Sequence, residues 1–208
     1  MPPRSHSQGE FDLKAAIAFA AAERAESCRV KQRLGPAQFT PLAEFVRASL
    51  QALRAGRRIY LFGNGGSAAD AQHIAAELLG RFRRHRAALP VLALTTNTSV
   101  LTAVSNDYGF AEVFARQVQG LVGADDVVVG ITTSGRSVNV LRGLRYARKA
   151  GAVTVVLCGA YTRQLRSVTD ILIAVPARDT QRIQEAHSLL GHIYCDLIEQ
   201  HLFSRPRR

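Results

Sequence analysis

The sequence predicts a doubly wound α/β fold, in which a five-stranded parallel sheet carries helices on both faces and follows two N-terminal helices. A length of 208 residues suits one domain with a single core. Five short apolar runs, rich in β-branched residues, alternate with helical segments, as is typical of buried parallel strands. Right-handed crossovers between such strands place helices on both faces of the sheet.

Two helices are predicted before the first strand. Residues 1–10 are polar, and we expect them to be disordered. Phe11 to Arg29 is alanine-rich, with apolar residues at helical spacing. Pro36 is interpreted as a break, and a second helix is predicted from Pro41 to Ala55. The apolar stripes of both helices favour packing against the domain and, in addition, against another subunit.

Strands and helices then alternate. Strands are predicted at Arg58–Phe62, Val91–Leu94, Val127–Ile131, Val153–Leu157 and Ile171–Val175. Helices are predicted at Ser67–Phe82, Val100–Ser105, Ala111–Leu121, Val138–Ala150 and Thr180–Phe203, with an irregular piece around Thr162–Arg166. We therefore expect one domain over residues 11–203 and a basic tail at 204–208. Ligands of such folds bind beyond the carboxyl ends of the strands, so the loops that follow the strands are the candidate site.

Composition narrows the classes of function. A hydrophobic content of 47% fits a globular protein, and no apolar run approaches the about 20 residues of a membrane span. The N-terminus lacks the apolar core of a signal peptide, and three separated cysteines fit reduced thiols, so we expect a cytoplasmic protein. The net charge of +11 suggests either an arginine-rich surface or anionic partners. The absence of a recognition motif argues against nucleic acid.

Two loops after predicted strands have the composition of anion-binding turns. In Gly63–Ser67 the glycines let backbone N–H groups approach a ligand at a helix N-terminus, without the GxGxxG or Walker pattern of nucleotide sites. Thr132–Asn139 offers four hydroxyls and a glycine where another helix begins. Ser137 also suits a plain N-cap. Two such loops in one sheet favour a phosphorylated small molecule.

A third group of polar residues suits a divalent metal ion. His73 and Glu77 share one face of a helix because they are four residues apart. Gln184 and His192 lie on the last predicted helix, in an otherwise apolar stretch. Their nitrogen and oxygen atoms are ligands that zinc accepts, while satisfied buried polar groups are the alternative interpretation. Gln184 and His192 are about 12 Å apart along the helix axis, so both would have to lean inward to share one ion.

In their order along the chain, these segments resemble the sugar isomerase (SIS) domain of the phosphoheptose isomerases. The resemblance is carried by Gly63–Ser67, Asp70–His73 with Glu77, Asn106–Phe110, Thr133–Asn139 and Arg182–His187. It extends from the first helix to about Phe203, and it implies the SIS fold with its flavodoxin-like sheet. Each motif is short, but the ordered set is specific.

The resemblance also implies an activity and its residues. The family interconverts sedoheptulose 7-phosphate and D-glycero-D-manno-heptose 7-phosphate by proton transfer through an enediol, and supplies heptose for lipopolysaccharide and other glycans. Its members are homotetramers with sites at subunit interfaces, often holding zinc. By position, His73, Glu77, Gln184 and His192 match the metal ligands, and Glu77 and His192 match the acid/base pair. The positions implied to bind substrate are Asn64, Gly65, Gly66, Ser67, Glu77, Arg81, Asn106, Asp107, Thr132, Thr133, Ser134, Ser137 and Gln184.

Two alternative functions remain open. Val100–Val104 and Cys195–Glu199 with Leu202 and Phe203 resemble the DnaA initiator-associating branch of the same family, which implies a non-catalytic regulator that binds the replication initiator. A phosphosugar sensor without turnover is the other alternative. The initiator-associating branch typically lacks the carboxylate at position 77 and the imidazole at position 192. This chain keeps both, which favours an enzyme.

Overall fold

The protein is described by a computed structural model over residues 11–203, so the expectations for residues 1–10 and 204–208 fall outside the described residues. The strands are β1 (Ile59–Gly63), β2 (Val91–Ala93), β3 (Val127–Thr132), β4 (Val153–Cys158) and β5 (Ile171–Ala174). The helices are α1 (Leu13–Gln32), α2 (Pro36–Arg54), α3 (Gly66–Leu79), α4 (Thr98–Tyr108), α5 (Val113–Leu121), α6 (Val138–Lys149) and α7 (Thr180–Phe203), with a short 3₁₀ helix, η1 (Phe110–Glu112). The five strands form one parallel sheet in the order β2-β1-β3-β4-β5. The predicted doubly wound, flavodoxin-like fold is confirmed.

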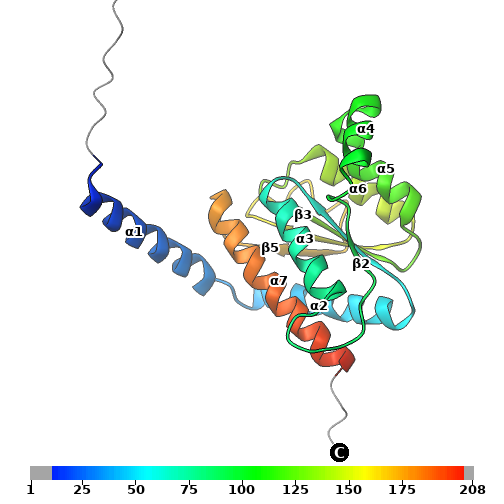
Figure 1. The fold of residues 1–208 in the computed structure, drawn as a ribbon, viewed down its shortest axis with the longest axis horizontal. Coiled ribbons are helices and arrows are strands. Elements are labelled where there is room, and N and C mark those ends of the chain that lie inside the picture. The colour runs from blue at the N-terminus through cyan, green and yellow to red at the C-terminus, as the bar shows by residue number, and fades with distance from the viewer. Residues whose placement is uncertain (1–10, 204–208) are drawn as a thin grey trace, which may run out of the picture.

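A hydrophobic core lies on each face of the sheet (Figure 1). Successive side chains of β1 alternate between the two: Ile59 and Leu61 join one core, and Tyr60 and Phe62 join the other. Helices α2, α3 and α7 cover the first face, and α5 and α6 cover the second. The pairing of α3 with α7 on one face matters most here, because these helices carry the residues predicted to bind metal.

Several helix boundaries differ from the prediction; α3, for example, ends at Leu79 and not at Phe82. The expected break lies at residues 33–35, directly before Pro36, but the helix start predicted at Pro41 was wrong, since Pro36 is the first residue of α2. Proline suits that position because its fixed φ is helical and the N–H it lacks would have no partner there. Helix α4 starts earlier than expected, because the side chain of Asn97 accepts a hydrogen bond from the backbone N–H of Val100 at 3.1 Å and caps the helix.

Helix α1 projects from the domain, and only its C-terminal end is attached (Figure 1). Ser27 and Val30 are its buried residues. Leu13, Ile17 and Phe19 are 63–67% exposed, so no described residue covers this apolar stripe. Arg182 of α7 fixes the attached end by donating from Nη1 to the carbonyl oxygen of Glu23 at 2.6 Å. Such an arm is suited to packing against another chain.

None of the helices in residues 11–203 combines the length and the apolar character that crossing a membrane requires.

Candidate active site

The two predicted anion-binding loops lie at the point where the strand order reverses. In the sheet, β2 lies next to β1 on one edge and β3 lies next to it on the other. Gly63, at the end of β1, lies opposite Ile131 of β3. The loops after these two strands therefore flank the crevice where doubly wound folds bind ligands.

The glycines of the first loop are explained by close contacts at Gly63 and Gly66 and by backbone conformation at Gly65. A Cβ on Gly63 would lie 2.8 Å from the carbonyl oxygen of Ile131, and one on Gly66 would lie 2.3 Å from Nε2 of Gln184. Gly65 has φ of 54°, a conformation that glycine tolerates best, and precedes the first turn of α3. Ser67 is buried in that turn. The loop thus brings the N-terminus of α3 to the crevice, with Gln184 beside it.

Two hydroxyls of the second loop, those of Thr132 and Ser137, lie next to each other. Thr132 Oγ1 and Ser137 Oγ are 3.1 Å apart, and Ser134 Oγ accepts a hydrogen bond from the N–H of Arg136 at 3.2 Å. Ser137 precedes α6, but its side chain makes no capping hydrogen bond, so the plain N-cap interpretation is not observed. Thr133 contributes its carbonyl oxygen, which accepts from the N–H of Gly159 at 3.2 Å. The hydroxyls therefore remain suited to an anion.

A residue that the sequence did not single out joins the two loops. Asn139, in the first turn of α6, is buried, and its carboxamide exchanges two hydrogen bonds with that of Asn64. Its Oδ1 also accepts from the N–H of Val140 at 2.9 Å. The only signal in the sequence was that an amide, Asn139, directly follows a hydroxyl-rich loop. The residue with which it pairs, Asn64, lies 75 positions away in sequence.

Three of the four residues predicted to bind metal lie together: His73, Glu77 and His192. Each offers a ligand atom, and these atoms all lie within 4.8 Å of one another. His73 Nε2 is 3.2 Å from Glu77 Oε1, and the rings of His73 and His192 meet edge to face with centroids 4.9 Å apart. Zinc binds such atoms at about 2.0–2.2 Å, so an ion among the three needs only small side-chain adjustments. The residues present therefore fit a divalent metal of the zinc type.

Helices α3 and α7 run parallel, and their polar residues are paired along their length. Gln184 lies against Gly66, Ser188 Oγ donates to Asp70 Oδ1 at 2.8 Å, and His192 lies beside His73. Gln184 is thus at the N-terminal end of the helix pair, two turns from His192. The single chain brings three of the four predicted metal ligands together and places Gln184 at the crevice.

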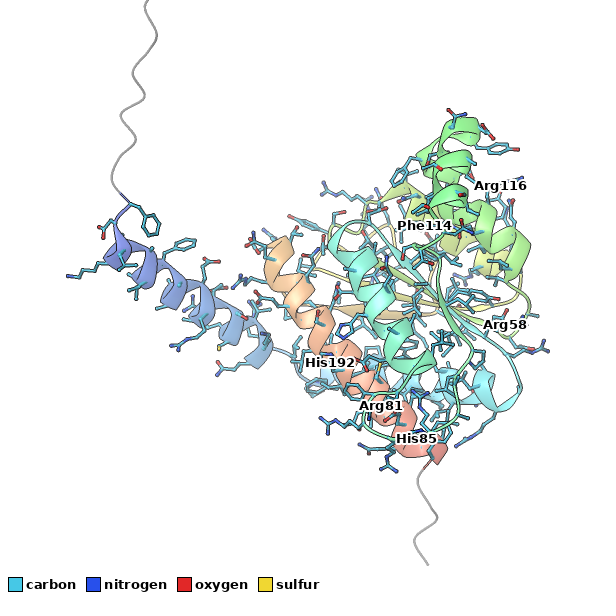
Figure 2. All side chains as sticks on the ribbon, in the orientation of Figure 1. Arg58, Arg81, His85, Phe114, Arg116 and His192 are labelled. Carbon is cyan, nitrogen blue, oxygen red and sulfur yellow. The ribbon has the colours of Figure 1, made fainter. Side chains whose placement is uncertain are left out.

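The remaining predicted substrate residues lie farther apart. Arg81 is exposed just beyond α3, at the same end of the domain as His192 (Figure 2). Asn106 and Asp107 end α4, where Asn106 Nδ2 donates to Asp107 Oδ1 at 2.8 Å. Helix α4 packs on α5 and projects away from the C-terminal half of α7 (Figure 1). This chain alone does not bring these two residues to the group of His73, Glu77 and His192.

Two buried titratable groups accompany the site. Burial raises the pKa of the Asp70 carboxyl, against the hydrogen bond from Ser188 and the nearby His73, which lower it. Asp70 and Ser188 line a small cavity together with His73, Glu77 and His192. His187, which the sequence left unassigned, lies in the core with Nε2 donating to the carbonyl oxygen of Cys158 at 3.3 Å. Burial lowers the pKa of His187 to about 4, so the ring is neutral.

The sequence and the fold match known proteins over most of the chain. The SIS domain profile matches residues 24–159. The phosphoheptose isomerase of Aquifex aeolicus (strain VF5) is 53% identical over 154 residues, which are 74% of this chain and 81% of that protein. The phosphoheptose isomerase of Geobacter sulfurreducens is 51% identical over 162 residues, which are 78% of this chain and 86% of that protein.

A solved structure extends the likeness to the fold. Phosphoheptose isomerase from Neisseria gonorrhoeae superposes with a TM-score of 0.82 at 42% identity, covering 89% of this chain and 99% of that one. The chain belongs to the SIS domain family and, within it, to the phosphoheptose isomerases.

Proposed function

We propose that this protein is a metal-dependent phosphoheptose isomerase that interconverts sedoheptulose 7-phosphate and D-glycero-D-manno-heptose 7-phosphate. The observation that carries the proposal is the convergence of His73, Glu77 and His192 from two helices of one chain. A carboxylate and two imidazoles can divide the proton transfers of an aldose–ketose isomerisation. No observation favours the alternative of a regulator that binds DnaA.

Glu77 and His192 perform the proton transfers in this proposal. Isomerisation moves a proton between C1 and C2 of the sugar through an enediol, so one group takes the carbon-bound proton and another serves the oxygens. Their ligand atoms lie within 4.8 Å of each other, close enough to act on neighbouring atoms of one substrate. A divalent ion such as zinc, held by His73, Glu77 and His192, would supply a Lewis acid for the carbonyl oxygen.

The loops at the crevice hold the phosphate of the sugar. The hydroxyls of Thr132, Thr133, Ser134 and Ser137 can donate to phosphate oxygens, and the N-terminus of α3 at Gly65–Ser67 favours negative charge. The net charge of +11 attracts a phosphorylated substrate from solution. In this proposal Asn64 and Gln184, which border the same loop, contact the sugar.

The active form in this proposal is a homotetramer whose sites lie between chains. Two features support it: the uncovered apolar stripe of α1, and the separation of Asn106 and Asp107 from the metal group. A neighbouring chain would then bring Asn106 and Asp107 to a shared site. The enzyme would act in the cytoplasm and supply heptose for lipopolysaccharide.

An assay of isomerisation of sedoheptulose 7-phosphate, with and without a chelator, tests the proposal. We expect turnover by the metal-replete enzyme, and its loss in Glu77→Gln and His192→Asn. The matched controls are Glu44→Gln and His201→Asn, which make the same changes at exposed helical positions and should leave turnover unchanged. Absence of turnover in the metal-replete wild type contradicts the proposed reaction, and phosphosugar binding without turnover would support the sensor instead.

A further inference from the structure

We propose that Phe82 is a positioning residue for His192, and that the buried ion pair of Glu199 and Arg86 fixes Phe82 in that role. The ring of Phe82 stacks on the imidazole of His192, with centroids 5.7 Å apart and planes 15° from parallel. His73 meets the same imidazole edge-on. His192 is therefore held between two rings, in an orientation that directs it toward Glu77. This inference rests on the proposed function.

Phe82 lies outside any helix or strand, so its place depends on side-chain contacts. The segment after α3 has its backbone fixed by Glu199 of α7 instead of by a neighbouring strand. The N–H groups of Phe82, Arg83 and Arg84 donate to the Glu199 carboxylate at 3.0, 2.9 and 3.0 Å. Three successive donors to one fully buried carboxylate leave this part of the chain little freedom.

Arg86 completes the clamp and extends it to α3. Its Nε donates to Glu199 Oε1 at 3.0 Å, and its guanidinium also donates to the carbonyl oxygens of Glu77 and Leu78 at 2.8 and 2.7 Å. These carbonyls belong to the last turn of α3, where intrahelical partners run out. One ion pair thus holds the end of α3 that carries Glu77, the segment that carries Phe82 and the helix that carries His192.

The charge of Glu199 is maintained although the side chain is buried. Burial raises the pKa of this carboxyl, but the three backbone donors and Arg86 outweigh that effect, so its pKa lies below the usual value. Leaving either partner of a buried pair without the other is costly, so the clamp is expected to stay formed. In this proposal the clamp fixes the backbone of Phe82, and its ring, packed against the core, then limits the rotation of the imidazole stacked on it.

The competing explanation is that Phe82 only fills the core. It is partly buried and packs at the edge of the core that contains α3 and α7. Leucine would fill most of the same space without offering a ring face, whereas tyrosine keeps the ring. Phe82→Leu and Phe82→Tyr therefore separate a positioning role from a packing role. Arg84→Ala is the control, since its side chain is exposed and its N–H still donates to Glu199.

The test measures zinc affinity by competition with a chromophoric chelator, alongside isomerase kinetics and the free energy of unfolding in urea. We expect Phe82→Leu to bind zinc about fivefold more weakly and to lose kcat with KM unchanged, because the phosphate is held at the distant loops. Phe82→Tyr and Arg84→Ala should match the wild type. The proposal is overturned if Phe82→Leu loses stability but keeps wild-type zinc affinity and kcat.

The two proposals fail in different ways. A wild type that neither binds zinc nor isomerises the sugar phosphate contradicts the proposed function. A wild type that does both, with Phe82→Leu indistinguishable from it, contradicts only the role of Phe82. Glu199→Gln extends the test. This variant keeps the Phe82 side chain but removes the carboxylate charge that fixes the Phe82 backbone, so we expect the same loss of zinc affinity as in Phe82→Leu.

Discussion

The carboxamides of Asn64 and Asn139 exchange two hydrogen bonds, of 2.9 and 2.8 Å, across the crevice between β1 and β3. Asn64 belongs to the loop that starts α3, and Asn139 to the first turn of α6. The paired residues of β1 and β3 end at Gly63 and Ile131, so no sheet pairing joins the two loops beyond that point. The pair therefore sets the distance between the two loops that we propose hold the phosphate.

Replacing either asparagine by leucine is expected to separate the loops. Asn139→Leu should weaken binding of inorganic phosphate about tenfold, because it removes both hydrogen bonds and leaves the Asn64 amide without a partner. The unfolding free energies of Asn64→Leu, Asn139→Leu and the double variant should be non-additive by about 1 kcal/mol. Additive losses, with phosphate affinity unchanged in Asn139→Leu, would show that the pair does not couple the loops.

Gly66→Ala is expected to impair catalysis with little effect on stability. The added methyl would lie 2.3 Å from Gln184 Nε2, and the flexible end of that side chain must move away from the crevice. We expect kcat/KM to fall at least about tenfold, with an unfolding free energy within about 1 kcal/mol of wild type. Gly120→Ala in α5 is the control, because its methyl meets no atom within 4 Å. Equal activity in both variants would remove Gln184 from the site.

His187 makes stability depend on pH. Its folded pKa is lowered from 6.5 to about 4, so below pH 6.5 the unfolded chain takes up a proton that the folded core does not. The wild type should therefore lose on the order of 2 kcal/mol of unfolding free energy between pH 7.5 and 5 on account of this group. Urea unfolding with a chelator present should show a smaller loss in His187→Gln. The same loss in both proteins would mean that His187 is not the cause.

Substitutions in the apolar stripe of α1 are expected to change assembly and not folding. Ile17 and Phe19 are 63% and 67% exposed in the single chain, so their replacement by serine removes no core contact. Ile17→Ser with Phe19→Ser should reduce the molar mass in light scattering to that of a smaller assembly, and activity should fall with it. Lys14→Ser, on the same exposed part of the helix, should leave the mass unchanged. A tetramer in both proteins would place the subunit interface elsewhere.

The parts of the fold that the sequence predicted well are those with local causes. Strand β3 is a run of β-branched residues, and the loops at Gly63–Ser67 and Thr132–Ser137 are defined by glycines and hydroxyls at strand ends. Pro36 was misread because proline disfavours a continuing helix but favours a starting one, and the residues around it do not distinguish the two.

The parts that the sequence did not predict depend on distant contacts. Glu199 and Phe82 are 117 positions apart, and a carboxylate near the end of a helix ordinarily indicates an exposed residue. The position of His187 also depends on distant contacts, because its burial against Cys158 follows from how α7 packs on the sheet. Residue types grouped His73 and Glu77 with His192 as candidate metal ligands but left buried, satisfied polar groups as the alternative, and it was the order of the motifs, through the resemblance to a family, that favoured the metal group.

The parallel alignment of α3 with α7 has a consequence for how the protein is made. Helix α7 is the last described element of the chain, and it supplies His192, Gln184 and Glu199. A ribosome releases α3 more than a hundred residues before α7, so His73 and Glu77 emerge without the partners that complete their site. The nascent chain therefore has no complete metal site until α7 has been made, and chains that stop short of α7 should be unable to retain the metal.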